Sequence, residues 1–190
     1  MAGNDWLGDR RTEVAADRIL DAADALFAEQ DAATVGMHEI AKAAGCSRAT
    51  LYRYFENREA LYTAYVHRES YRLFHQMTEQ LSGVEEPRER LIEGMVSSLR
   101  NVRESPALSS WFVATQRPIG GEVAAQSDVI TGLVAAFLSD LWPDMETEAA
   151  HRRANWLVRM LVSLLMFPGA DEDDERAMLD EFVVAQLVPQ

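Results

Sequence analysis

At 190 residues the chain can hold one sizeable core or a small module joined to a larger one, and its 48% hydrophobic content excludes a disordered chain. Its single cysteine excludes a disulfide framework and, with no signal peptide at the N-terminus, favours a cytoplasmic protein. The net charge of -13 argues against nucleic-acid binding unless basic residues gather locally, because affinity for DNA rests largely on neutralising phosphates.

A first amphipathic helix is expected to begin near Thr12 and to run through Phe27. Its apolar residues recur at the i, i+3, i+4 and i+7 spacing that places them on one face. This face can pack on the two short helices predicted next, which completes a three-helix module. The apolar residues are Ala16, Ile19, Leu20, Ala23, Leu26 and Phe27.

Residues 40–55 predict two short helices joined by a tight turn. Gly45 can take the left-handed conformation that ends a helix, and Ser47 is a good N-cap for the next one. Each helix carries two apolar residues one turn apart, so both pairs can share a small core. These pairs are Ile40 with Ala44, and Leu51 with Phe55.

Arginine, tyrosine and threonine residues remain on the outside of the second short helix. A helix with such a face, supported by another helix across a glycine turn, is typical of the helix-turn-helix that binds DNA. The local charge agrees, since three basic residues and one acid lie between Met37 and Phe55, although an ordinary solvated face is the alternative. The outward residues are Arg48, Ala49, Thr50, Tyr52, Arg53 and Tyr54.

The rest of the chain predicts further helices and no strand. Asn57 can cap a long helix, and Pro87 stands at the first turn of the next. The segment 117–121, with a proline and two glycines, is expected to be a loop. The expected helices cover residues 58–81, 87–103, 106–116, 122–141 and 147–167, with a last helix that begins in the acidic run 171–175.

The segment 156–167 is the most apolar of the chain and is too short to cross a bilayer. Because its helix is apolar on nearly every side, it needs partners on two faces. The last helix adds a second apolar stripe, and two such helices from each of two copies can form a four-helix dimer interface. Residues expected in this interface are Leu161, Leu165, Met178, Leu179, Phe182 and Val183.

Arg159 interrupts that apolar segment. A buried arginine without a partner would cost several kcal/mol. We therefore expect Arg159 either to pair with a carboxylate, which we favour, or to contact an anionic group of a ligand.

The sequence lacks the arrangements that catalysis or metal binding requires. It contains no nucleophile–base constellation, no phosphate loop and no metal-ligand spacing, so we expect neither an enzyme nor a metal or other cofactor. Cys46 could act as a redox switch, but a lone cysteine in an apolar position is more often a small core residue.

Residues 19–65 resemble the DNA-binding domain of the TetR family of bacterial transcriptional regulators. The matching pieces are Ile19-Leu20-Asp21-Ala22-Ala23, Leu26-Phe27-Ala28, Ile40-Ala41, Ala44-Gly45, Ser47, Thr50-Leu51-Tyr52-Arg53-Tyr54-Phe55 and Arg58-Glu59-Ala60-Leu61. The resemblance implies an all-α chain, with a helix-turn-helix domain over 1–57 and a larger helical ligand-binding and dimerisation domain over 58–190. It also implies a homodimeric regulator, in our prediction a repressor, that binds a palindromic operator in double-stranded DNA and is released by a small inducer.

The same resemblance assigns contacts with DNA. The positions that match Arg48 and Ala49 face base edges in the family. Those that match Thr50, Tyr52 and Tyr54 mostly hold phosphates. The predicted DNA-binding residues are His38, Ser47, Arg48, Ala49, Thr50, Tyr52, Arg53, Tyr54 and Arg58.

The chain departs from the family's pattern in three places, and at a fourth it carries a related residue. Arg58 replaces a common lysine and can still bind phosphate, through a fork instead of a point charge. Asp31 replaces a glycine in the turn after the first helix, and Cys46 replaces a valine. Val35-Gly36-Met37 replaces threonines that touch phosphate, so phosphate anchoring at the second helix would depend on His38.

The resemblance further implies a cavity for the inducer among the C-terminal helices. Aromatic residues and methionines in that half are usually core, but they also supply adaptable apolar surface. We expect a hydrophobic or amphipathic inducer. The residues expected to contact it are Met95, Trp111, Phe112, Phe137, Trp156, Arg159 and Met160.

A second function remains open at this point. The altered phosphate positions near Gly36 and the acidic balance would also suit a helical small-molecule-binding or interaction protein with an impaired DNA-binding head. Steeply salt-dependent binding to a palindromic duplex would distinguish the regulator from this alternative.

Overall fold

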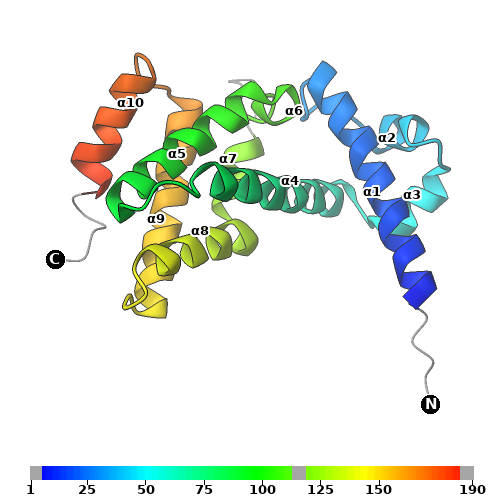
Figure 1. Ribbon diagram of the computed structural model, residues 1–190. Coiled ribbons are helices and arrows are strands. Elements are labelled where there is room, and N and C mark those ends of the chain that lie inside the picture. Colours follow the sequence, from blue (N-terminus) through cyan, green and yellow to red (C-terminus); the bar gives the residue numbers. More distant parts are fainter. Residues whose placement is uncertain (1–5, 113–118, 185–190) are drawn as a thin grey trace.

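The computed structural model describes residues 6–112 and 119–184, and it places side chains for 14–112 and 120–183. Every element in these ranges is helical, so the predicted all-α class is confirmed (Figure 1). Three helices gather at one end of the molecule, and a long fourth helix joins them to the larger second group. The first four are α1 (Trp6–Glu29), α2 (Met37–Ala43), α3 (Arg48–Tyr54) and α4 (Arg58–Gln80).

The second group surrounds the far half of α4 (Figure 1). It ends in a short helix that continues as a π-helical turn over Leu179–Val184. Its helices are α5 (Pro87–Glu104), α6 (Pro106–Ser109), α7 (Ile119–Ala125), α8 (Asp128–Leu141), α9 (Thr147–Met166) and α10 (Glu172–Met178).

Local signals place the helix-turn-helix as the sequence predicts. Gly45 has φ +66°, which is the left-handed conformation expected at the end of α2. The Ser47 hydroxyl accepts a hydrogen bond from the Thr50 amide at 3.0 Å, so Ser47 caps α3. Asn57 caps α4 in the same way through the Ala60 amide, at 2.7 Å.

Several predicted boundaries are wrong between Pro106 and Leu141. The helix expected over 106–116 ends at Ser109, and residues 113–118 lie outside the described ranges. The helix expected over 122–141 is two helices, because the Ser127 hydroxyl accepts from the Ile130 amide at 3.2 Å and starts α8. The first helix also begins earlier than expected, at Trp6 instead of Thr12.

The two glycines of the predicted loop lie inside a helix, α7. A Cβ atom on Gly120 would lie 2.8 Å from the backbone oxygen of Trp111, and the Gly120 amide donates to that same oxygen at 3.0 Å. Glycine is therefore needed at residue 120 for a close approach of two backbones. The sequence showed the glycines but not the segment that lies against them.

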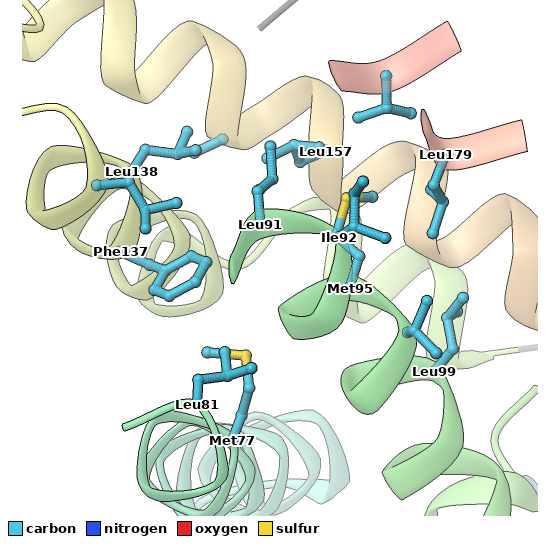
Figure 2. Packing of buried hydrophobic residues seen from close by; sticks show 14 of the residues in the cluster. Met77, Leu81, Leu91, Ile92, Met95, Leu99, Phe137, Leu138, Leu157 and Leu179 are labelled. Carbon is cyan, nitrogen blue, oxygen red and sulfur yellow. The ribbon is translucent and has the colours of Figure 1, made fainter. Parts of the chain in front are cut away.

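Two hydrophobic clusters fill the molecule. The first lies in the helix-turn-helix end and extends beyond 1–57, since it includes Tyr62 and Tyr65 of α4 and Trp111 after α6. The second joins α4, α5, α8 and α9 with the end of the chain (Figure 2). The long helix α4 thus contributes side chains to both clusters and joins the two halves of the molecule.

No helix within the described ranges combines the length and apolar character needed to cross a membrane. Among the same residues, no group of His, Cys, Asp and Glu side chains is arranged to hold a metal ion.

Candidate nucleic-acid interface and ligand cavity

The recognition helix α3 is divided into a buried and an exposed side. Leu51 is fully buried in the first cluster, and Phe55 packs beside it at the end of the helix. The predicted DNA-binding residues lie on the other side. Ser47, Arg48, Ala49, Tyr52 and Arg53 are exposed, and Thr50 and Tyr54 are half-buried.

Two arginines of α3 lie over tyrosine rings. The Arg48 guanidinium lies 5.9 Å from the centre of the Tyr52 ring, one turn further along the helix. The Arg53 guanidinium lies 5.4 Å from the centre of the Tyr54 ring. Such cation–π contacts restrict the arginine rotamers, so the charged groups are partly ordered before any DNA is present.

At the start of α2, other residues stand in place of the phosphate-binding threonines that the resemblance leads one to expect. Val35 and Met37 are buried in the first cluster and are used for packing. The Glu39 carboxylate accepts a hydrogen bond from the Gly36 amide at 2.8 Å, so the single acid of this segment caps its own helix. His38 and Lys42 remain exposed and are free to meet a phosphate.

Asp31, which stands where the family usually has glycine, closes the turn after α1 with its side chain. Its carboxylate accepts from the Ala33 amide at 2.8 Å, and its backbone oxygen accepts from the Thr34 amide at 2.8 Å. This Asx-turn reverses the chain without a left-handed residue.

Arg58 has a structural role that the sequence did not reveal. Its Nε donates to the Tyr62 hydroxyl at 2.7 Å, and its Nη2 donates to the backbone oxygens of Ala32 and Ala33. The Tyr62 hydroxyl in turn donates to the Ala32 oxygen. Arg58 thus binds the turn after α1 to the start of α4, and a phosphate contact would be additional to this role.

Replacing Arg58 by alanine is therefore expected to lower the free energy of unfolding by about 2 kcal/mol, because hydrogen bonds from a charged donor are lost and the Ala33 carbonyl is left unpaired, while the Ala32 carbonyl keeps the Tyr62 hydroxyl. Arg53→Ala, which removes an exposed arginine from α3, serves as the control and should change stability by less than about 0.5 kcal/mol. Urea unfolding measures both. If Arg58→Ala leaves the stability unchanged but weakens DNA binding, then Arg58 serves only to anchor a phosphate.

A cavity of about 180 Å³ lies between α4, α5, α7, α8 and α9. Phe137 of α8 and Met77 of α4 point toward one another beside it (Figure 2). Four of the seven residues predicted to contact a ligand belong to its wall. These are Met95, Trp111, Phe112 and Phe137.

The other three predicted ligand residues lie elsewhere on α9, off the wall of this cavity. The cavity side of α9 is formed by Leu157, Leu161 and Leu165, at helical spacing. The helical period turns Trp156 and Arg159 to the opposite side, where both are exposed, and Met160 lies half-buried off the cavity wall. Arg159 is neither buried nor paired with a carboxylate among the described residues.

The predicted dimer residues differ in their exposure within the chain. Leu161 and Leu165 line the cavity, and Leu179 and Val183 are only 1% exposed within their own chain. Met178 is partly buried against the same core, whereas Phe182 is 59% exposed. Among the described residues, the large apolar side chains left exposed at this end of the molecule are Trp156, Phe167 and Phe182.

Sequence reasoning missed the contribution of α4 to the cavity. An apolar stripe continues along α4 past the helix-turn-helix and reaches Met77, and it was visible in the sequence as a helical pattern. The lining residues on α4 are Val66, Glu69, Ser70, Leu73, Phe74 and Met77.

Trp111 links this cavity to the helix-turn-helix end. It belongs to the cavity wall and is 2% exposed. Its ring stacks on Tyr65 with centroids 5.5 Å apart and an interplanar angle of 12°, and it meets the Phe27 ring edge-on at 5.4 Å. The Tyr65 hydroxyl donates to Asp24 of α1 at 2.7 Å, and burial together with this carboxylate raises the pKa of Tyr65.

Ion pairs hold α10 against α5. The buried Glu175 carboxylate accepts from both Nη atoms of Arg103 at 2.7 Å and from the Gly169 amide at 2.9 Å. The hydrogen bond from Arg103 lowers the pKa of Glu175. More exposed pairs flank it, with Arg100–Glu172 at 2.5 Å and Arg88–Asp180 at 2.7 Å.

The comparisons with known proteins agree with this geometry. Residues 19–65 match the family model described as bacterial regulatory proteins of the tetR family. An uncharacterised HTH-type transcriptional regulator of Mycobacterium tuberculosis is 61% identical over 189 residues, which is 100% of this chain and 93% of the relative.

Solved structures extend the likeness to the whole fold. The TetR family repressor AlkX of a Dietzia strain, implicated in biodegradation of n-alkanes, has a TM-score of 0.66 and 26% identity over 90% of this chain and 93% of its own. RolR, solved in complex with resorcinol, has a TM-score of 0.71 and 19% identity over 95% of this chain and 91% of its own.

Proposed function

The chain belongs to the TetR family of bacterial transcriptional regulators, and we propose that it is a homodimeric repressor that binds a palindromic operator. A small, mostly apolar ligand would release it from this operator. Its place of action would be the cytoplasm, where the DNA lies. The exposed side of α3, with Arg48 at its start, supports the role in DNA binding.

The single observation that carries the ligand response is the course of α4. Its first turns pack on the helix-turn-helix, where Tyr62 and Tyr65 belong to the first cluster, and its later turns form one wall of the cavity. A ligand that fits better when α4 is displaced would favour a conformation with wrongly spaced recognition helices. Operator affinity would then fall by the coupling free energy, typically about 1–3 kcal/mol.

The known proteins of this fold support the class of ligand. RolR was solved with resorcinol, a small aromatic molecule, and AlkX is implicated in the biodegradation of n-alkanes. The cavity of this chain has an almost wholly apolar wall, which suits a ligand of that general kind.

Dimerisation would place two recognition helices about 34–36 Å apart, one turn of DNA, so that they read the two halves of a palindrome. The exposed Trp156, Phe167 and Phe182 support an interface built on α9 and the end of the chain. Large exposed apolar side chains on neighbouring elements are typical of surfaces that bind another protein.

The test of DNA recognition is Arg48→Ala. We expect it to weaken operator binding by about 1–3 kcal/mol and to relax the base preference at one position in each half-site, because an arginine at the start of a recognition helix binds base edges. Arg100→Ala, which removes an exposed arginine from α5, matches the charge change and should leave both properties unchanged. Selection of bound sequences from random DNA, followed by titration at fixed salt, measures both effects.

An equal loss of affinity for operator and random DNA would show that Arg48 holds phosphate instead of reading a base. A ligand-binding protein that no longer binds DNA is the second candidate, since the start of α2 lacks the family's phosphate-binding threonines. No salt-dependent binding to any selected duplex would favour that candidate.

A further inference from the structure

A polar groove lies beside the cavity, where α4 and α5 face each other. The two helices are joined by a short turn and diverge from it toward the helix-turn-helix end (Figure 1). The groove has a volume of about 250 Å³, and polar atoms make up most of its wall. Its α4 side spans residues 69–76, which is roughly 10 Å at 1.5 Å per residue. Side chains in its wall include Glu69, Arg72, Leu73 and Gln76 of α4, with Asn101 and Glu104 of α5.

One end of the groove is closed by a contact between the two helices. The Ser97 hydroxyl of α5 donates to Gln80 Oε1 of α4 at 2.7 Å. Because the helices are antiparallel, Asn101 is opposite Gln76, one turn beyond this contact. No hydrogen bond joins Gln76 and Asn101, although both are described and both lie in the wall of the groove. The line between α4 and α5 is therefore closed at Gln80 and open one turn further.

The opposite end of the groove is closed by residues that follow α5. Leu108 of α6 belongs to the wall of the groove. Trp111 then packs on α4, with its ring centroid 5.0 Å from that of Tyr62 and 5.5 Å from that of Tyr65. The groove is thus an opening of limited length between two closed contacts, and we call it the window.

The window and the cavity share part of their walls. Glu69, Leu73 and Leu108 line both, so the two spaces come closest at these side chains. The Glu69 carboxylate is held by Arg68 at 3.0 Å and by Arg72 at 3.1 Å. Leu108 is only 9% exposed, whereas Leu73 is half-buried. A half-buried leucine can change rotamer without any change in the backbone, so Leu73 is the most easily moved of the three.

We propose that ligands enter and leave the cavity through this window and that Leu73 is its gate. A rotamer change of Leu73 joins the polar groove to the apolar cavity, while the ion pairs keep Glu69 in place. The polar wall of the window is hydrated, and the apolar wall behind it binds the ligand. This inference rests on the proposed function, in which the cavity is the effector site, and adds the path by which an effector reaches it.

Iodobenzene is a suitable probe of this path. It is small, uncharged and apolar, and the cavity of about 180 Å³ exceeds the roughly 150 Å³ of an apolar cavity that binds benzene. Its iodine atom quenches the fluorescence of a tryptophan that it contacts. Trp111 lies in the cavity wall and is 2% exposed, so its quenching reports entry. Stopped-flow fluorescence of the full-length protein separates this phase from the immediate quenching of the exposed Trp156.

A chemical block of the window tests the path. In Asn101→Cys, prepared with Cys46→Ala to remove the native thiol, reaction with N-cyclohexylmaleimide places a bulky uncharged group in the window. The association rate constant of iodobenzene should then fall at least about tenfold relative to the unmodified variant. His75→Cys in the same background is the control, because His75 is exposed on α4 but is not in the window wall. Its modification should change the rate by less than about twofold.

The gate is tested by Leu73→Ala. Removing most of this side chain should raise the association and dissociation rate constants of iodobenzene at least about threefold, because no rotamer change is then needed. Leu133→Ala is the matched control, since Leu133 of α8 lines the cavity but not the window. It enlarges the cavity by the same number of atoms and should change the association rate constant by less than about twofold.

Equal association rates with and without the adduct at residue 101 would place the entrance elsewhere and overturn the window. An unchanged rate in Leu73→Ala, or an equal increase in Leu133→Ala, would overturn the role of Leu73 as the gate. If iodobenzene does not quench Trp111 in the wild-type protein, the inference is wrong as a whole. Operator binding by the ligand-free protein tests the proposed function separately, because it does not depend on the probe.

Discussion

Replacing Trp156 and Phe182 together by glutamate is expected to convert the protein to monomers and to lower its operator affinity by at least about a hundredfold. Both side chains are apolar and exposed, at 38% and 59%, on the elements proposed to meet a second copy. A carboxylate at either position would be buried without a partner in an apolar interface. The monomer then loses the gain in affinity that comes from binding two half-sites at once. For linked sites this gain is about 10²–10⁴-fold.

Sedimentation velocity measures the oligomeric state, and titration of a palindromic duplex measures the affinity. Tyr71→Glu is a matched control, because Tyr71 is also aromatic and 48% exposed but lies on α4. It should leave the dimer intact. A stable dimer in the double variant would remove α9 and the end of the chain from the interface. Leu161 and Leu179 are unsuitable for this test, because they belong to the cavity wall and to the core of their own chain.

Glu175→Gln is expected to lower the free energy of unfolding by about 2 kcal/mol at neutral pH. The carboxylate is buried and paired with Arg103, and removing one charge of such a pair leaves the other poorly compensated. The expected cost is below the usual range for buried pairs because 35% of the Arg103 side chain is exposed and can be hydrated. For a chain of this size the melting temperature should fall by about 4–8 °C.

The pH dependence of this difference gives a second check. The hydrogen bond from Arg103 lowers the pKa of Glu175 below its ordinary value of 4.5, so the folded state binds the proton less readily than the unfolded state. The stabilisation is therefore complete above about pH 4.5 and is lost as the pH falls through the lower pKa of the folded state. Wild type and Glu175→Gln should accordingly approach one another in stability in acid.

The control for Glu175 is Glu148→Gln, in which an exposed glutamate 3.4 Å from Arg152 is replaced. Exposed ion pairs contribute little to stability, so the free energy of unfolding should change by less than about 0.5 kcal/mol. Equal effects of the two substitutions would mean that the Arg103–Glu175 pair does not hold α10 on α5.

The acidic composition is compatible with a DNA-binding head because several acids near it are engaged in contacts within the chain. Asp24 accepts from Tyr65, Asp21 pairs with Arg68 at 2.8 Å, and Glu39 caps α2. The exposed Arg48 and Arg53 of α3 are not paired with acids among the described residues. Local placement, not the net charge of the chain, decides what this surface can bind.

The helix-turn-helix could be predicted from the sequence because its signals are local. The left-handed Gly45, the Ser47 cap and the buried Leu51 all act within a few residues, and each has a specific backbone or spacing requirement. The same holds for Asn57 and Pro87 at the starts of α4 and α5. For this reason the helix-turn-helix, the all-α class and the family followed from the sequence alone.

The tertiary structure alone decided which face of the C-terminal helices is used. The apolar pattern of α9 does not say which side meets the cavity and which meets solvent, because both sides carry large apolar residues. The position of α9 against α8 and α5 turns Leu161 inward and Trp156 outward. Likewise, the role of Gly120 depends on Trp111, and that of Arg58 depends on carbonyls 25 and 26 residues away. Such contacts join segments distant in sequence, and no local pattern encodes them.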